Sequence, residues 1–267
     1  FRRVLFRSDS LFKNTSLVKD MREMFCTVRD AYESEVDIEF TANFLEDGSY
    51  RINLVQCRPL QIQEASESVE PLPDIDPDRM IMDARGATIG HSRKIRIDRL
   101  IYVVPELYGK LSEQNRYRVA KLIGKLTQTG MEETGRIMLI GPGRWGTSTP
   151  SLGIPVSFRE INNTSVLCEI DSMHERLVPD LSLGTHFFNE LVELNMLYVA
   201  YFVGRQGNSI NTRFLINEDN QLPRLLEDED AWANLVKVID FPGGNGKKRA
   251  LYLNANALEQ RSVLYVE

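Results

Sequence analysis

Residues 35–60 carry the most regular pattern of apolar and polar positions in the chain. Apolar residues alternate with polar ones, as is typical of a half-buried β-strand; the apolar positions are Ile38, Phe40, Ala42 and Phe44. The dipeptide Asp47-Gly48 follows, and Asp-Gly favours a two-residue turn because both of its residues readily adopt positive φ. A second strand is predicted over Tyr50–Cys57, so the segment is expected to be a β-hairpin.

A two-residue turn would fix which residues of the hairpin face each other. With Glu46 opposite Ser49, Glu39 lies opposite Gln56, and Asp37 lies opposite Arg58. These four residues share one face of the hairpin, because directly opposite residues and alternate residues of a strand point to the same side. The other face is expected to place the apolar residues of the first strand against Val55 and Cys57.

The polar face of this hairpin has a chemical interpretation. A carboxylate (Glu39) and an amide oxygen (Gln56) are hard ligands suited to Mg²⁺, which is usually held by few protein groups and by substrate phosphates. Arg58 can bind phosphate oxygens with two parallel hydrogen bonds. The alternative is a solvated surface on which Asp37 and Arg58 form a weak ion pair.

The pattern predicts further elements on both sides of an acidic, Pro-rich linker at residues 64–78. A helix is expected over Leu11–Glu33, with an apolar stripe that packs on the hairpin. Residues 79–267 are expected to form a second domain, so the predicted fold class is α+β or mixed α/β. Its strands are predicted over 98–104, 136–140, 165–170, 197–203, 212–216, 236–241, 250–253 and 262–266, and its helices over 112–126 and 228–235.

A glycine- and proline-rich segment, Gly141–Pro155, follows the apolar strand predicted over 136–140. Such a loop can bind an anion with its N–H groups, here those of Gly141 and Gly143. Arg144 could hold a phosphate and Trp145 could stack on a flat ring. The alternative is a structural connection with Trp145 buried in the core. The segment has neither a Walker motif nor a dinucleotide-binding fingerprint.

Composition narrows the possible functions. The net charge of −6 gives no general case for nucleic-acid binding, and no apolar run is long enough for a membrane span. Three scattered cysteines argue against a disulfide framework and favour the cytoplasm. Residues 1–8 are too short for a signal peptide. They resemble a translated sequencing adapter and are expected to be an artefact of a truncated chain, with an amphipathic arm as the alternative.

The motifs VDIEF and LVQCRPLQ resemble the end of the ATP-grasp nucleotide-binding domain of pyruvate phosphate dikinase and phosphoenolpyruvate synthase. In that family the glutamate of D-I-E and the glutamine of Q-x-R-P hold the metal of Mg-ATP, and the arginine contacts the transferring phosphate. The resemblance therefore implies Glu39 and Gln56 as metal ligands and Arg58 as a catalytic and phosphate-binding residue. Residues 9–63 would be the C-terminal segment of this domain; the family's Gly-rich lid, adenine pocket and upstream lysine and arginine are not in this chain.

The second domain also resembles part of dikinase-like proteins, a poorly characterised region that carries GPGRWG, LGIPVSF and GTHFF. The family's swivelling domain uses a phosphoryl-accepting histidine, and His186, at a predicted helix start, is a candidate for that role. The family's surrounding motif is absent, so a structural or ligand-contacting role is the alternative. His91 and His174 are expected at the surface.

The resemblance implies the C-terminal part of an ATP-dependent phosphotransferase, with Mg²⁺ and ATP as cofactors. The acceptor would be a histidine or a small molecule such as pyruvate, so a nucleotide and pyruvate or phosphoenolpyruvate are the expected partners. Neither nucleic acid nor a membrane is expected, and an oligomer is left open. The alternatives are a regulatory protein that binds ATP without turnover, and a fragment inactive because half of its nucleotide site is missing.

Overall fold

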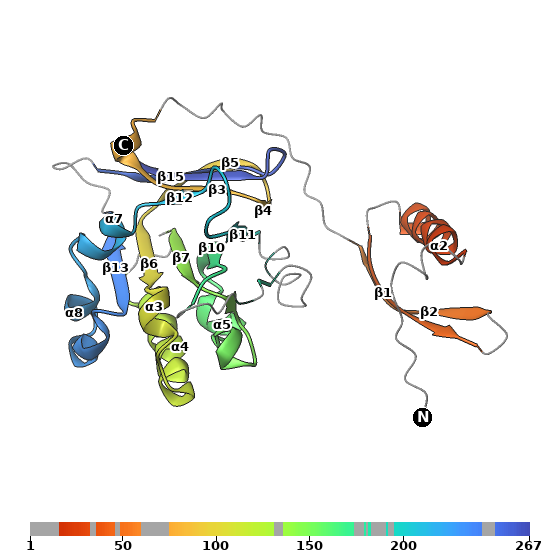
Figure 1. Ribbon diagram of the computed structural model, residues 1–267, viewed down its shortest axis with the longest axis horizontal. Coiled ribbons are helices and arrows are strands. Elements are labelled where there is room, and N and C mark those ends of the chain that lie inside the picture. Colours follow the sequence, from red (N-terminus) through yellow and green to blue (C-terminus); the bar gives the residue numbers. More distant parts are fainter. Residues whose placement is uncertain are drawn as a thin grey trace. The chain divides into compact units, whose positions relative to one another are not determined.

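The computed structural model describes residues 16–32, 36–45, 49–59, 75–130, 136–173, 179, 181–182, 191, 195–241 and 249–267. The chain folds as two units, an N-terminal unit, Phe1–Ala65, and a C-terminal unit, Ser66–Glu267 (Figure 1). The division falls within the acidic, Pro-rich part of the sequence.

The described part of the N-terminal unit contains helix α2 (Leu17–Tyr32) and a hairpin of strands β1 (Val36–Phe44) and β2 (Tyr50–Pro59). The least exposed residues of the helix lie on one stripe that includes Leu17, Met21 and Met24, as the spacing predicts. The Tyr50 hydroxyl hydrogen-bonds with Ser16 and Asp20, which ties the start of the helix to β2. The predicted helix is therefore confirmed over residues 17–32.

The hairpin register differs from the prediction near the turn and agrees with it farther away. Leu45 donates its N–H to the Ser49 carbonyl, so the predicted pairing of Glu46 with Ser49 is wrong. A β-bulge between the pairs Glu39–Gln56 and Phe40–Leu54 leaves Val55 as the extra residue of β2. Val55 is consequently exposed and does not join the apolar face of the hairpin.

The C-terminal unit is built on a six-stranded sheet with the order β13-β6-β7-β10-β11-β4. Its four central strands are parallel: β6 (Arg99–Val103), β7 (Ile137–Pro142), β10 (Thr164–Ile170) and β11 (Leu197–Tyr201). The edge strands β13 (Val236–Asp240) and β4 (Ala87–Ile89) are antiparallel to their neighbours. The strand predicted over 136–140 therefore lies inside the sheet, and all residues of β7 are buried.

A second, five-stranded sheet is antiparallel throughout and has the order β12-β3-β15-β14-β5. Its strands are β12 (Ser209–Ile210), β3 (Met80–Arg85), β15 (Arg261–Val266), β14 (Leu251–Asn256) and β5 (Arg93–Ile97). The sheet thus combines strands from the beginning and the end of the unit.

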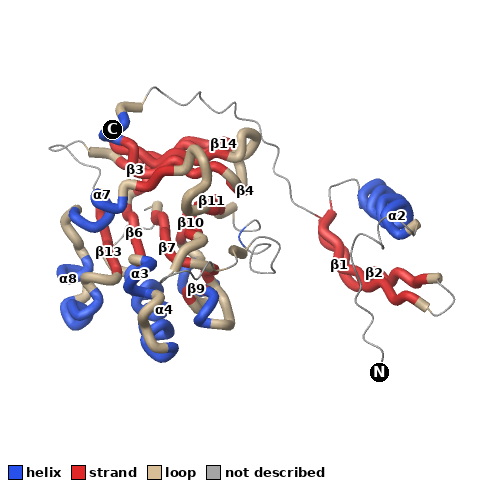
Figure 2. The backbone as a smooth tube through the Cα atoms, in the orientation of Figure 1, coloured by secondary structure: helices blue, strands red, loops and turns tan. Residues whose placement is uncertain are grey.

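The two sheets and a helical layer form a three-layer sandwich (Figures 1 and 2). Along β7, Met138 and Ile140 pack with residues of the five-stranded sheet, whereas Ile137 and Leu139 pack with helix α4 (Glu113–Gln128). This alternation explains why the central strands are apolar on both faces. The Ser112 side chain caps α4 by accepting the N–H of Asn115.

The described part of the unit also contains short elements. They are the helices α3 (Pro105–Tyr108), α5 (Phe158–Ile161), α7 (Thr212–Asn217) and α8 (Leu222–Leu225), the 3₁₀ turns η1 (Pro77–Arg79), η2 (Pro150–Leu152) and η3 (Glu227–Trp232), and the two-residue strands β8 (Arg144–Trp145) and β9 (Gly153–Ile154).

The predicted mixed α/β class is confirmed, and most predicted strands are present with ends shifted by a few residues. The strand predicted over 212–216 is wrong, because this segment is helix α7. The Asn211 side chain accepts the N–H of Phe214, and this N-cap starts a helix in spite of the β-branched and aromatic residues. The segment predicted as a helix over 228–235 forms the 3₁₀ turn η3, and strands β3 to β5 were not predicted.

Candidate functional site

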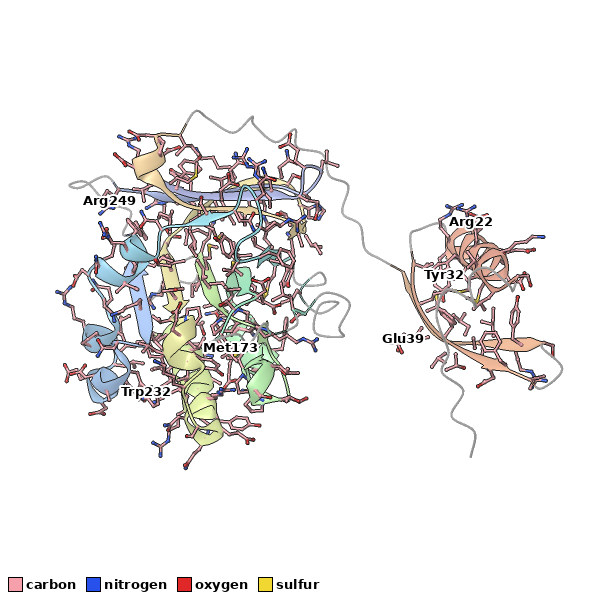
Figure 3. The ribbon with its side chains drawn as sticks, viewed as in Figure 1. Arg22, Tyr32, Glu39, Met173, Trp232 and Arg249 are labelled. Atoms are coloured by element: carbon pink, nitrogen blue, oxygen red, sulfur yellow. The ribbon has the colours of Figure 1, made fainter. Side chains whose placement is uncertain are left out.

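The polar face of the hairpin brings together the residues proposed from the sequence as metal ligands. Glu39 on β1 is the cross-strand partner of Gln56 on β2, and Asp37 is the partner of Arg58. Side chains of directly opposite residues have Cβ atoms roughly 4.5–5.5 Å apart. Figure 3 shows Glu39 on the side of the hairpin away from helix α2. The carboxylate is therefore on the face that the helix leaves open.

The β-bulge at Val55 separates this polar face from the turn. The pairs on the turn side of the bulge are shifted by one residue, and those beyond it keep the register expected from the sequence. Glu39 and Gln56 are both partly buried, and each makes a polar or electrostatic contact in the structure. Glu39 and Gln56 are thus brought together by the register of the strand ends near Val36 and Pro59.

The donor set at this face fits Mg²⁺ bound to a nucleotide. One carboxylate and one amide oxygen would leave most of the coordination sphere to water and phosphate oxygens, as Mg²⁺ prefers. Within the described ranges, no group of three or more His, Cys, Asp or Glu side chains could hold a metal by protein ligands alone.

The glycine-rich segment after β7 doubles back on the sheet. Strands β8 and β9 pair side by side, with Arg144 next to Gly153 and Trp145 next to Ile154. Gly143 donates its N–H to the Ile170 carbonyl at 2.8 Å, and Gly146 donates to Ile154 at 2.9 Å. These N–H groups are used within the fold, which speaks against the anion-binding loop expected from the sequence.

Trp145 is completely buried in this segment. Its indole N–H donates to the Cys168 carbonyl at 3.0 Å, and its ring contacts the position where a Cβ of Gly141 would lie. The ring has no free face for a ligand, so the structure favours the second interpretation from the sequence, a tryptophan in the core. Arg144 is partly buried and has a polar or electrostatic contact of its own.

Glu169 on β10 anchors the same segment and was not singled out from the sequence. Its buried carboxylate accepts hydrogen bonds from the Trp145 N–H, the Ser182 N–H and hydroxyl, and the Tyr198 hydroxyl at 2.6–3.0 Å. Burial raises the pKa of Glu169, and the hydrogen bonds oppose this effect without reversing it. A lone acidic residue within an otherwise apolar strand was the available signal.

The remaining candidates are the histidines. His186 and His174 lie outside the described residues. His91, which was expected at the surface, is partly buried in the loop before β5. In the described part of the chain, no helix has the length and apolar character needed to cross a membrane.

Comparison with known proteins gives no relative: no protein-family model, no curated protein and no solved structure matches the chain.

Proposed function

We propose that the hairpin β1–β2 is the metal- and phosphate-binding part of an Mg-ATP site in a phosphoryl-transfer protein of the dikinase type. The observation that carries this proposal is the register that pairs Glu39 with Gln56 and Asp37 with Arg58. The same residues make up the two motifs that resemble the dikinase family. Register and motif are independent observations, because the pairing follows from the backbone alone.

The roles follow from the chemistry of each residue. Glu39 and Gln56 would hold Mg²⁺ by one oxygen each, and the bound ion would offset charge on the phosphate oxygens. Arg58 would bind the transferring phosphate, as guanidinium groups do bidentately. In the transfer, the bond from the moving phosphorus to the nucleotide oxygen breaks and a bond to the acceptor atom forms. Such a step needs positioning and charge stabilisation and little covalent chemistry from the protein.

The first test is calorimetric titration of the full chain with ATP, with Mg²⁺ and then with EDTA. Wild-type protein should bind only with Mg²⁺, and Glu39→Ala and Arg58→Ala should each weaken binding by roughly tenfold or more, the value of a charge-assisted contact. Arg51→Ala is the matched control, because Arg51 is an exposed arginine on the same strand, on the turn side of the bulge.

Binding that survives both substitutions, or that does not need Mg²⁺, would overturn the assignment of this face. If binding is confirmed, incubation with γ-labelled ATP separates transfer from sensing. Acid-labile label on the protein that is lost in His186→Asn would support transfer to that histidine. A protein that binds Mg-ATP through Glu39 yet never transfers label to itself or to pyruvate would instead be a nucleotide sensor.

A further inference from the structure

The C-terminal unit contains a polar cavity of about 470 Å³ at the edge of the sandwich where the parallel strands begin. Four strand starts meet there. Arg93 is the first residue of β5, Arg136 directly precedes β7, Thr164 is the first residue of β10, and Asn195 lies just before β11. The cavity therefore lies where strand starts and the loops before them meet, and its volume is in the range of small-molecule sites.

The charged side chains among the described residues of the cavity lining are all basic. The described lining includes Arg93, Lys94 and Arg136 but neither Asp nor Glu. Lys94 is neutralised by Glu267, at 2.7 Å. Asp98 accepts the backbone N–H of Arg136 and pairs its carboxylate with Arg96. Two guanidinium groups thus remain without a carboxylate partner among the described residues.

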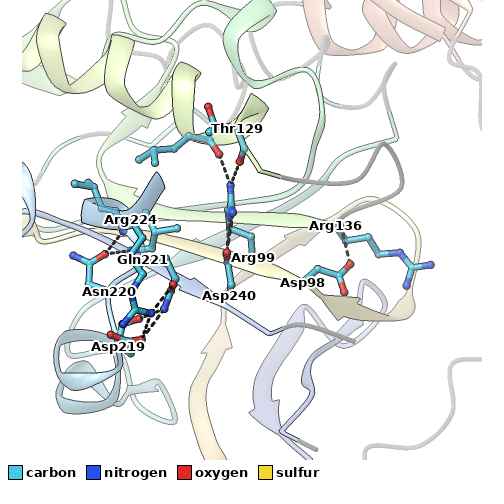
Figure 4. Close-up of polar contacts among 12 residues, drawn as sticks. Asp98, Arg99, Thr129, Arg136, Asp219, Asn220, Gln221, Arg224 and Asp240 are labelled. Carbon is cyan, nitrogen blue, oxygen red and sulfur yellow. Dashed lines mark hydrogen bonds and ion pairs between the residues drawn. The ribbon is translucent and has the colours of Figure 1, made fainter. Parts of the chain in front are cut away.

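The guanidinium of Arg93 is held by neutral groups. It donates to the side-chain and backbone oxygens of Asn195 at 3.1 and 2.8 Å, which fixes it at the cavity. Figure 4 shows the side chain of Arg136 extended away from Asp98. Within the described residues, no hydrogen-bond or ion-pair partner reaches the Arg136 guanidinium. Burial lowers the pKa of Arg93, and the positive charge of Arg136 lowers it further, so the two charges repel each other.

Two buried polar atoms at the cavity also lack a partner in the described part of the chain. They are Nε of Arg93 and the hydroxyl oxygen of Thr164, a residue that is only 3% exposed. An unpaired buried donor costs about 1–3 kcal/mol, so these atoms make this edge of the fold locally unfavourable. An oxyanion in the cavity would accept from the outer guanidinium nitrogens and would offset the repulsion between the arginines.

We propose that this cavity binds a small phosphate monoester, with its phosphate between Arg93 and Arg136. Two guanidinium groups match the two negative charges of a monoester. The cavity exceeds the size of a phosphate alone, and the remaining lining, which includes Asn162 and Ser165, offers amide and hydroxyl groups to a polar remainder such as a sugar. This site lies in the other unit from the proposed Mg-ATP face and is independent of it.

The test is calorimetry of the full chain with ribose 5-phosphate and with inorganic phosphate, in EDTA at low ionic strength. Ribose 5-phosphate should bind, and more tightly than inorganic phosphate. Arg136→Gln should weaken its binding at least tenfold. Arg118→Gln, an exposed residue of α4, removes the same charge elsewhere and should change binding less than twofold.

Absence of binding by wild-type protein, or equal binding by wild type and Arg136→Gln, would overturn the proposal. Equal affinity for the ester and for inorganic phosphate would overturn the assignment of a monoester. Arg136→Gln is preferred over Arg93→Gln because the Arg93 side chain holds Asn195 and its loss could disturb the fold. Glu39→Ala should leave ribose 5-phosphate binding unchanged, which keeps this result separate from the Mg-ATP test.

Discussion

The carboxylate of Glu169 lies in the core among two backbone N–H groups and two hydroxyls. Burial disfavours its ionised form, and the folded protein therefore holds a proton that the unfolded chain releases at lower pH. A glutamate in this position links the glycine-rich segment, strand β10 and Tyr198, and its charge state affects all three.

Replacement of Glu169 by glutamine should remove a pH dependence of stability. The pKa of Glu169 is raised in the folded state, so its favourable contribution is complete below the ordinary value of 4.5 and is lost as pH rises toward the folded pKa. In that window the stability of wild type relative to Glu169→Gln should fall by about 1.4 kcal/mol for each pH unit. Urea unfolding of both proteins between pH 4 and 8 measures this difference; a constant or rising difference contradicts the assignment.

The segment between β7 and β10 depends on glycine where its strands meet. Gly143 has φ of +63°, and a Cβ at this position would lie 2.2 Å from the Leu152 carbonyl oxygen. The close approach of β8 and β9 therefore needs a residue without a side chain. The same close contact between β8 and β9 holds Trp145 against the sheet, so the glycines of this segment serve packing.

Gly143→Ala should lower the free energy of unfolding by about 3 kcal/mol or more, from a left-handed backbone and a clash with main chain. Gly204→Ala is the matched control, because Gly204 has φ of +76° but nothing within 4 Å of the added methyl group. The control should lose only about 1 kcal/mol. Similar losses of unfolding free energy in the two variants, measured by chemical denaturation, would show that the contact between β8 and β9 tolerates a side chain at Gly143.

The hairpin shows what could be predicted from the pattern of residues and what could not. The pairing of Glu39 with Gln56 was predicted from a two-residue turn, and it holds because the bulge at Val55 compensates for the one-residue shift of the register near the turn. The β-bulge at Val55 was not predictable, since nothing in LVQC distinguishes a bulged from a regular strand. Likewise, the sequence was compatible with Trp145 in the core and with Trp145 stacked on a ligand. The structure distinguishes the two, because the indole N–H donates to the Cys168 carbonyl.

Arg99 joins parts of the C-terminal unit that are far apart in the sequence. It is fully buried, donates to Asp240 through two hydrogen bonds of 2.7 and 2.8 Å, and also donates to carbonyls at the end of α4, at Leu126 and Thr129 (Figure 4). One guanidinium thus connects β6, β13 and the helical layer. A buried charge of this kind is costly when its partner is removed.

Asp240→Ala should destabilise the protein by about 3 kcal/mol, because it leaves the Arg99 charge buried without its carboxylate. Asp219→Ala is the control: Asp219 pairs with Arg224, and both side chains are about two-thirds exposed. That change should cost no more than about 0.5 kcal/mol. Thermal or urea unfolding of the two variants tests the contrast, and equal effects would mean that Arg99 finds other compensation.

The order of strands in the sandwich could not be predicted from the sequence pattern. Apolar runs predicted most strands, but β3 and β5 carry charged residues such as Asp83 and Arg96 among their apolar positions, and β4 is only three residues long, so these strands were missed. The phosphate-monoester cavity depends on this topology, since Arg93 begins β5 of one sheet and Arg136 directly precedes β7 of the other. Neither arginine belongs to a motif, which is why no spacing along the chain pointed to them.

The position of β14 and β15 between β3 and β5 also governs how the C-terminal unit can form during synthesis. These strands leave the ribosome roughly 150 residues after β5, a delay on the order of ten seconds at typical elongation rates. Until then β3 and β5 have unpaired edges, and the apolar face of the six-stranded sheet has no complete cover. The nascent chain therefore carries a surface of the kind that chaperones bind, and it completes its fold only when β15 emerges.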